Sequence, residues 1–251
     1  MKKNLWIISI IVLLVMVAAF FGYTMRYYHA TDTAAAALES DDVIVAQTVF
    51  GWRFDGPADD KALVFYPGGK VDETAYAPLL HRIANSGMDV FLVKMPLHLA
   101  IFGKNAAEKI VAQYDYENWY IGGHSLGGVM AVYYAADHDL DGVILLAAYP
   151  TKAIDEPMLI IYGSEDGVLD LGRVKEAQQF GTVEEVVIAG GNHAGFGNYG
   201  EQNGDRVSAI SEEKQQEETA DAISSWLLGS CPENAARVSD NSGGDRFSPA
   251  D

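Results

Sequence analysis

Hydrophobic residues run without a break near the start of the chain. Residues 5–23 (LWIISIIVLLVMVAAFFGY) carry no charge, and a helix of this length spans roughly 28 Å, about the thickness of the hydrocarbon core of a bilayer. The run predicts one N-terminal transmembrane helix in an anchor of residues 1–28. A signal peptide is the alternative, because lysines precede the run and small residues follow it at 34–37. The aromatic residues that crowd its outer end favour the uncleaved anchor.

Basic residues around the anchor indicate its orientation. Lys2 and Lys3 precede the apolar run and only Arg26 closely follows it, which predicts a cytoplasmic N-terminus. We therefore expect a single-pass protein of the cell membrane whose body lies on the extracytoplasmic side. Residues 29–42 contain alanine, threonine and acidic residues without a strong apolar stripe, as is typical of a short spacer.

From residue 43 onward, short β-branched or aromatic runs alternate with amphipathic stretches. This alternation is typical of a mostly parallel sheet with crossover helices, an α/β fold. The predicted strands are 43–54, 62–66, 89–94, 117–122, 142–147, 158–162 and 183–188, and the predicted helices are 73–86, 104–113, 126–137, 170–179 and 212–228. The pattern continues to about residue 229, so 43–229 is expected to form one domain. Residues 230–251 are rich in Ser, Asn, Asp and Gly, which favours a disordered tail.

Charge is distributed unevenly along the chain. All 35 acidic residues lie beyond the anchor 1–28, together with 14 of the 17 basic ones (all except Lys2, Lys3 and Arg26), so the body carries a net charge of −21. A surface this negative repels phosphate backbones and argues against nucleic acid as a partner. Neutral or cationic substrates are expected. The only cysteine, Cys231, lies in the polar tail without a histidine or cation beside it, and it is interpreted as inert.

The strongest local motif is Gly-His-Ser-Leu-Gly-Gly at 123–128, between an apolar run and a helical pattern. This is the context of a nucleophile elbow, in which glycines two residues before and after the serine let strand and helix approach closely. The motif predicts Ser125 as a nucleophile. The backbone amide of Leu126, at a helix N-terminus, is then oriented to stabilise an oxyanion.

A serine hydroxyl requires a histidine base and an acid that orients this base. An elbow serine is followed along the chain first by the acid and then by the histidine. Asp166 follows the strand 158–162, at the edge where ligand sites lie in such sheets, and His193 lies in a loop of small residues after the next strand. These two are the predicted partners of Ser125, with Glu165 and Asp170 as rival acids.

The remaining histidines are given lesser roles. His124 precedes the nucleophile and is expected to support the site, since its side chain should point away from the serine hydroxyl. His98 follows a strand and could line the pocket. Structural roles are expected for the other three, His29, His81 and His138.

A second oxyanion donor is expected in the loop Tyr-Pro-Gly-Gly-Lys at 66–70, which follows an early strand. Pro67 has no N–H to donate. The backbone amide of Gly69 is the first candidate, and that of Lys70 is the next.

Four motifs, YPGGKV, GHSLGG, YGSEDGV and GGNHAGFG, occur in this order over residues 62–227. Together they resemble the α/β-hydrolase superfamily, in particular the small group without a lid that is related to dienelactone hydrolases. The resemblance implies an α/β-hydrolase fold and assigns nucleophile, acid and base to Ser125, Asp166 and His193, with no metal and no cofactor. Dienelactone hydrolases use a cysteine nucleophile, whereas position 125 here is serine, so dienelactone is not the expected substrate.

Only 41 positions separate Ser125 from Asp166, which leaves no room for a helical lid between them. The site is therefore expected to be open and to accept a small-molecule or surface-presented acyl substrate. The predicted function is that of a membrane-anchored serine hydrolase that cleaves a carboxylic ester through an acyl-enzyme. A peptidase or acyltransferase using the same triad remains an alternative, as does a non-catalytic binding module tethered to the membrane.

Overall fold

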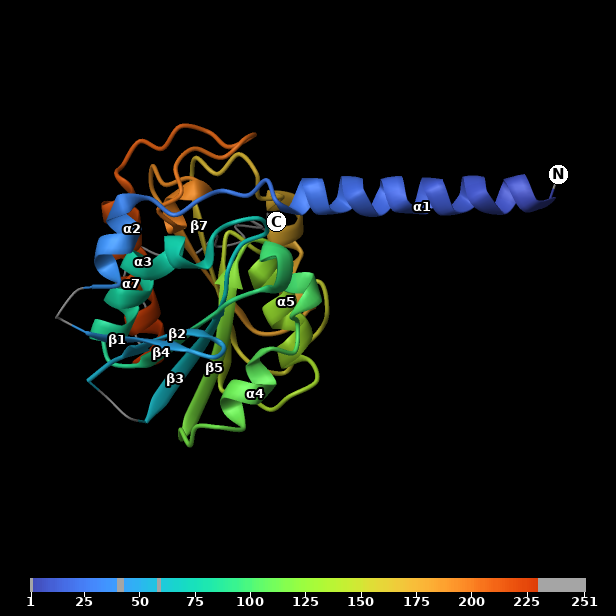
Figure 1. The fold of residues 1–251 in the computed structure, drawn as a ribbon. Helices are drawn as coiled ribbons and strands as arrows, with labels where there is room; N and C mark the ends of the chain where they lie inside the picture. The colour runs from blue at the N-terminus through green and yellow to red at the C-terminus, as the bar shows by residue number, and fades with distance from the viewer. Residues whose placement is uncertain (1, 40–42, 58–59, 230–251) are drawn as a thin grey trace, which may run out of the picture.

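An eight-stranded sheet lies between two layers of helices, and one long helix projects from the domain (Figure 1). The computed structural model describes residues 2–39, 43–57 and 60–229, and side chains from residue 6 onward. The strands are β1 Ile44–Thr48, β2 Gly51–Asp55, β3 Lys61–Tyr66, β4 Asp89–Val93, β5 Asn118–His124, β6 Gly142–Leu146, β7 Met158–Gly163 and β8 Val183–Ile188. The helices are α1 Lys2–Thr24, α2 Asp32–Ala37, α3 Ala77–Asn85, α4 Ala107–Val111, α5 Leu126–Ala135, α6 Leu171–Lys175 and α7 Glu212–Leu227, with short 3-10 turns η1 Glu73–Tyr76, η2 Pro96–His98, η3 Ala100–Phe102, η4 Ala177–Gln179 and η5 Ala194–Phe196.

The strands follow the order β1-β2-β4-β3-β5-β6-β7-β8. All neighbouring pairs from β4 to β8 are parallel, whereas β1 and β2 add an antiparallel hairpin at one edge. The predicted mostly parallel sheet is confirmed. The prediction of one strand over 43–54 is wrong, because the chain reverses at 49–50 and enters β2 through Gly51, whose φ of 143° favours glycine.

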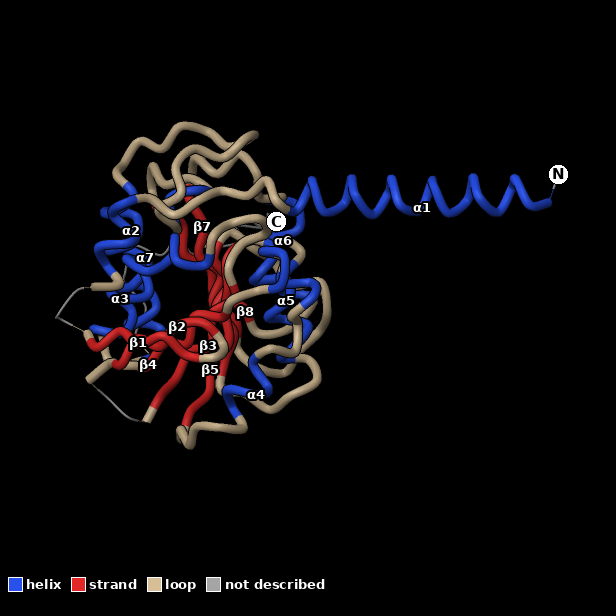
Figure 2. The backbone as a smooth tube through the Cα atoms, viewed as in Figure 1, coloured by secondary structure: helices blue, strands red, loops and turns tan. Residues whose placement is uncertain are grey.

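Each face of the sheet carries its own hydrophobic core. In β3, Leu63 and Phe65 point toward α2, α3 and α7, whereas Val64 and Tyr66 point toward α4 and α5. Figure 2 shows the helices on both sides of the strands. This burial on both faces explains why the central strands are almost continuously apolar.

The helices differ from the sequence prediction mainly at their ends. The predicted helix 73–86 begins as the 3-10 turn η1, and the predicted helix 104–113 is confined to α4. Asp170 caps α6 rather than belonging to it, since its carboxylate accepts hydrogen bonds from the amides of Gly172 and Arg173. From Ser125 to Asp166 the chain forms only α5, β6 and β7 as regular elements. No lid domain is inserted there, in agreement with the prediction.

The segment that follows α1 lies against the domain. The amide of Tyr28 donates to the carbonyl of Lys70 at 2.7 Å, and the amide of Asp72 donates to the carbonyl of Tyr28 at 2.8 Å. Ala34 of α2 is fully buried, and α2 packs on α3. Up to residue 39 the predicted spacer is therefore held against the domain by backbone hydrogen bonds and a small apolar contact.

The helix α1 leaves the domain as an extended rod (Figure 1). Its residues Trp6–Thr24 are long and apolar enough to cross a membrane, and nearly all of them are exposed in the structure. A membrane anchor and a signal sequence both fit this helix. The predicted disordered tail, 230–251, lies outside the described residues.

Candidate active site

Ser125 occupies the sharp turn between β5 and α5. Its backbone has φ 52° and ψ −121°, a conformation rarely adopted by a residue with a side chain. A Cβ at Gly123 would lie 2.5 Å from the carbonyl oxygen of Tyr66, and one at Gly127 would overlap the same oxygen. Glycine is therefore required at both positions for the turn to pack against β3, and the strained turn leaves Ser125 half-exposed.

Asp166 and His193 are brought together from two loops at the carboxyl ends of β7 and β8. His193 Nδ1 lies 2.9 Å from Asp166 Oδ2, and both side chains are buried. Asp166 Oδ1 accepts hydrogen bonds from the amides of Val168 and Leu169 at 2.8 and 2.7 Å. These two hydrogen bonds fix the orientation of the carboxylate. The other ring nitrogen, Nε2 of His193, is buried without a hydrogen-bond partner among the described residues.

The rival acids point elsewhere. Glu165 is half-exposed and forms a 3.8 Å ion pair with Arg206, and Asp170 caps α6. Of the three acids considered from sequence, Asp166 is therefore the one whose carboxylate contacts His193.

His124 joins the elbow to the loop that carries His193. Its Nε2 lies 3.1 Å from the carbonyl oxygen of His193, its Nδ1 lies 2.8 Å from the hydroxyl of Tyr76, and the two imidazole rings are 4.6 Å apart. Burial, together with the neighbouring His193, holds the pKa of His124 well below its usual value of 6.5. The ring is thus neutral, with its single proton on Nε2 because a carbonyl can only accept.

The hydroxyl of Tyr76 extends this connection to the loop after β3. It accepts a hydrogen bond from the amide of Gly68 at 3.0 Å, and it donates to Nδ1 of His124. Desolvation raises the pKa of Tyr76, so the hydroxyl keeps the proton that it donates. A buried chain of hydrogen bonds therefore runs from Gly68 through Tyr76 and His124 to the backbone of His193.

The expected oxyanion donors lie on adjacent segments. A Cβ at Gly69 would lie 3.0 Å from Cδ2 of Leu126, so the loop after β3 contacts the first residue of α5. As the first helical residue, Leu126 has an N–H without an acceptor inside the helix. The amide of Lys70 donates to the carbonyl of His98 at 2.7 Å, and that of Gly68 donates to Tyr76. The amides on both sides of Gly69 therefore already donate hydrogen bonds within the protein.

Two residues that sequence reasoning missed hold the acid and base loops together. Asp205 accepts from the amide of Gly167 and from that of Ala194, both at 2.9 Å. Arg206 donates to the carbonyl of Asp166 at 2.7 Å. The sequence marks them only as an acidic residue followed by a basic one in a polar loop, a pattern that is common on solvated surfaces.

The other histidines lie outside this cluster. His98 stacks on Tyr27 at 3.8 Å, and His138 stacks on Tyr134 at the same distance, near the far end of α5. His29 lies 4.3 Å from Tyr27, ring to ring, and His81 belongs to α3. His98 thus lies beside the loop after β3 instead of beside His193.

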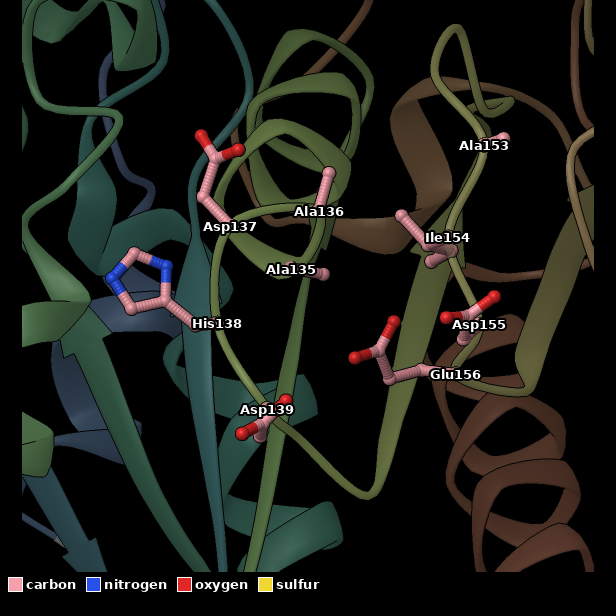
Figure 3. Close-up of a pocket in the computed structure, with 9 residues that line it drawn as sticks. All are labelled: Ala135, Ala136, Asp137, His138, Asp139, Ala153, Ile154, Asp155 and Glu156. Atoms are coloured by element: carbon pink, nitrogen blue, oxygen red, sulfur yellow. The ribbon is translucent and has the colours of Figure 1, made fainter.

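A hollow of about 410 Å³ opens at the end of α5 away from Ser125. Figure 3 shows its side chains at the end of α5, on the loop that follows it and on the facing loop before β7. It is lined by Ala135, Ala136, Asp137, His138, Asp139, Ala153, Ile154, Asp155 and Glu156. None of the predicted site residues lines it. Within the described residues, no group of three His, Cys, Asp or Glu side chains could hold a metal ion.

Comparisons with known proteins agree with this fold. Structures of similar fold include Est1E from Butyrivibrio proteoclasticus (13% identity, 74% of this chain and 98% of that chain covered, TM-score 0.55) and a dienelactone hydrolase from Anabaena variabilis (12%, 76% and 97%, 0.53). An esterase domain from a Rhodothermus marinus protein is also similar (14%, 74% and 96%, 0.52). No curated protein sequence matches the chain. The profile described as "Alpha/beta hydrolase family" matches residues 62–217, more than half of the chain, and the protein therefore belongs to the α/β-hydrolase family and is a hydrolase.

Proposed function

We propose that the protein is a membrane-anchored serine esterase with Ser125 as nucleophile, His193 as general base and Asp166 as the acid that orients the base. The observation that carries this proposal is the buried His193–Asp166 pair at 2.9 Å, whose second nitrogen, Nε2, has no partner among the described residues. A base in this state can accept the proton of a hydroxyl that rotates toward it. The ring of His193 lies 4.6 Å from that of His124, the residue next to Ser125.

In the proposed reaction, Oγ of Ser125 attacks the ester carbonyl and its proton passes to Nε2 of His193. The amides of Leu126 and Gly69 stabilise the oxyanion of the tetrahedral intermediate. The bond to the leaving alcohol then breaks, and the alcohol takes the proton from His193. Water, deprotonated by the same nitrogen, hydrolyses the acyl-enzyme and regenerates the serine.

Ester cleavage is preferred over amide cleavage because two of the solved structures of similar fold are named as esterases or esterase domains. The absence of an inserted lid between Ser125 and Asp166 supports an open site that accepts small or surface-presented acyl groups. Peptidase and acyltransferase activity would use the same three residues. Turnover of an ester and an amide with the same acyl group distinguishes an esterase from a peptidase.

Anchoring is supported by the exposed apolar helix Trp6–Thr24. The excess of lysine before this helix supports an extracytoplasmic domain. Membrane fractionation of the full chain after a carbonate wash tests the anchor, since a cleaved signal sequence would leave the domain in the soluble fraction. Protease accessibility in intact cells tests the orientation.

Labelling of the detergent-solubilised full chain by a fluorophosphonate probe tests the catalytic assignment. We expect the unaltered chain to be labelled, Ser125→Ala to show no labelling, and Asp166→Asn and His193→Ala to react at least 100-fold more slowly. Glu165→Gln is the matched control, because this neighbouring acid does not contact His193, and it should react like the unaltered chain. A folded protein that never reacts would instead support the non-catalytic binding module.

A further inference from the structure

The end of α1 lies beside η3, a turn of the domain far away in the sequence. The rings of Phe20 and Phe102 meet edge to face with centroids 6.1 Å apart. Phe20 precedes Thr24, the last residue of the apolar span, by four positions, which is about 6 Å along a helix axis. A side chain in contact with Phe20 therefore lies at the depth of the last turn of the span, not beyond its end.

The turn η3 presents two large apolar side chains to the outside. Ile101 is 57% exposed and Phe102 is 53% exposed, whereas Ala100 is fully buried. The turn packs on α5 through its base. Two adjacent exposed apolar side chains gain free energy when they leave water, and they are suited to the boundary between lipid headgroups and acyl chains.

Further contacts fix the end of α1 relative to this turn. Nζ of Lys70 lies 3.8 Å from the centre of the Tyr23 ring. Tyr27 stacks on His98, whose carbonyl accepts the hydrogen bond from the amide of Lys70. Since a tyrosine ring and a lysine beside it are typical of the membrane interface, these contacts place the interface at the loop after β3.

We propose that Ile101 and Phe102 insert into the lipid bilayer next to α1 and form a second membrane contact of the domain. The inference rests on the proposed membrane anchor. The partner is the bilayer because Phe102 contacts Phe20 in the span that the proposed anchor places in lipid, and Ile101 is next to Phe102. Since the body carries a net charge of −21, apolar insertion rather than attraction to anionic headgroups supplies the contact.

This contact also bears on the substrate. The turn η3 packs on α5, which begins directly after Ser125, and Lys70 adjoins Gly69, the proposed oxyanion donor. The rim of the proposed active site is thus held at the membrane surface. Acyl substrates that reside in the outer leaflet would reach it without first entering water.

Fluorescent labelling of the full chain in neutral phosphatidylcholine vesicles tests the contact. With Cys231 replaced by serine, an environment-sensitive nitrobenzoxadiazole group is attached to one new cysteine at a time, at Val15, Phe102 or Val49. Val15 lies in α1, and Val49, 89% exposed in the β1–β2 turn, is the matched control. We expect spin-labelled lipids to quench the probes at positions 15 and 102. The extent of quenching at position 102 should be about threefold or more that at position 49.

Each other outcome overturns the inference in a distinct way. Quenching at position 15 with none above the control at position 102 would refute the second contact and leave the anchor intact. A probe at position 102 that is shielded from water without lipid quenching would indicate a protein partner, such as a second copy. An unquenched probe at position 15 would refute the anchor and the contact together.

A functional measurement complements the labelling. In the variant that combines Ile101→Glu and Phe102→Glu, hydrolysis of an ester dissolved in the vesicle membrane should fall about tenfold, whereas hydrolysis of a short water-soluble ester should be unchanged. Val49→Glu should alter neither rate. If the double variant hydrolysed both esters at the rates of the unaltered chain, the proposed role would be contradicted. Loss of both rates with Ser125 still reactive toward fluorophosphonate would point to damage of the fold.

Discussion

The Nε2 atom of His124 lies 3.1 Å from the carbonyl oxygen of His193. The residue before the nucleophile thus holds the backbone of the proposed base, and through Tyr76 it also reaches the amide of Gly68 beside the proposed oxyanion donor. Three segments of the site, the loop after β3, the elbow and the loop after β8, are therefore joined by one buried hydrogen-bonded chain. This agrees with the expectation that His124 supports the site, and it allows the contribution of the chain to stability and catalysis to be measured.

Tyr76→Phe should lower both the stability of the domain and its catalytic rate. Loss of the hydroxyl leaves two buried groups, Nδ1 of His124 and the amide of Gly68, without this partner, which should cost about 1–3 kcal/mol of unfolding free energy. Because Gly68 adjoins Gly69, we also expect kcat for a soluble ester to fall roughly tenfold. Urea unfolding and steady-state kinetics measure the two effects. Tyr133→Phe on the exposed side of α5 should change neither, and an unchanged kcat in Tyr76→Phe would contradict the proposed coupling.

The stability of the domain should depend on pH through His124. Its pKa is lowered in the folded state, chiefly by burial, so below pH 6.5 the unfolded chain binds a proton that the native state does not. Stability is therefore lost as pH falls through 6.5, by at most about 2 kcal/mol at pH 5 for one such group. Urea unfolding at pH 7 and pH 5 should show a smaller loss for His124→Gln than for the unaltered chain. Equal losses would contradict this assignment.

Asp205→Ala should disturb the geometry of the proposed acid and base without removing either. The carboxylate of Asp205 bridges the amides of Gly167 and Ala194, each next to a proposed catalytic residue. We expect kcat to fall about 10- to 100-fold with little change in KM, because the substrate is not contacted directly. Glu201→Ala, an exposed change in the same loop, is the control. If Asp205→Ala raised KM alone, the residue would contact substrate instead.

The segment after α1 should stabilise the domain. A soluble chain that begins at residue 26 keeps the backbone hydrogen bonds of Tyr28 with Lys70 and Asp72 and that of Thr31 with Asn198, whereas one that begins at residue 38 loses all three and the buried Ala34. The shorter form should be less stable by about 2–4 kcal/mol. Its reaction with fluorophosphonate should also be slower, because Lys70 follows Gly69. Equal stability of the two forms in urea would show that the segment is only a tether.

The sequence by itself determined the features that depend on local chemistry. The alternation of apolar runs indicated the α/β sandwich, and the glycines around Ser125 indicated the elbow, since the steric demands of that turn are met within a few residues. The uninterrupted apolar run likewise indicated a helix able to span a membrane. The chain order of Ser125, Asp166 and His193 was sufficient to select residues that the fold brings to one edge of the sheet.

Only the tertiary structure decided the contacts between segments distant in the chain. Tyr76 and His124 are 48 residues apart, Asp205 meets a loop 38 residues away, and the hydroxyl of Tyr28 accepts from the amide of Asn203, 175 residues away. Phe20 and Phe102 meet only because α1 ends beside η3. Such pairs leave no periodic trace in the sequence, because their geometry depends on which strands become neighbours and where the connecting loops cross the edge of the sheet.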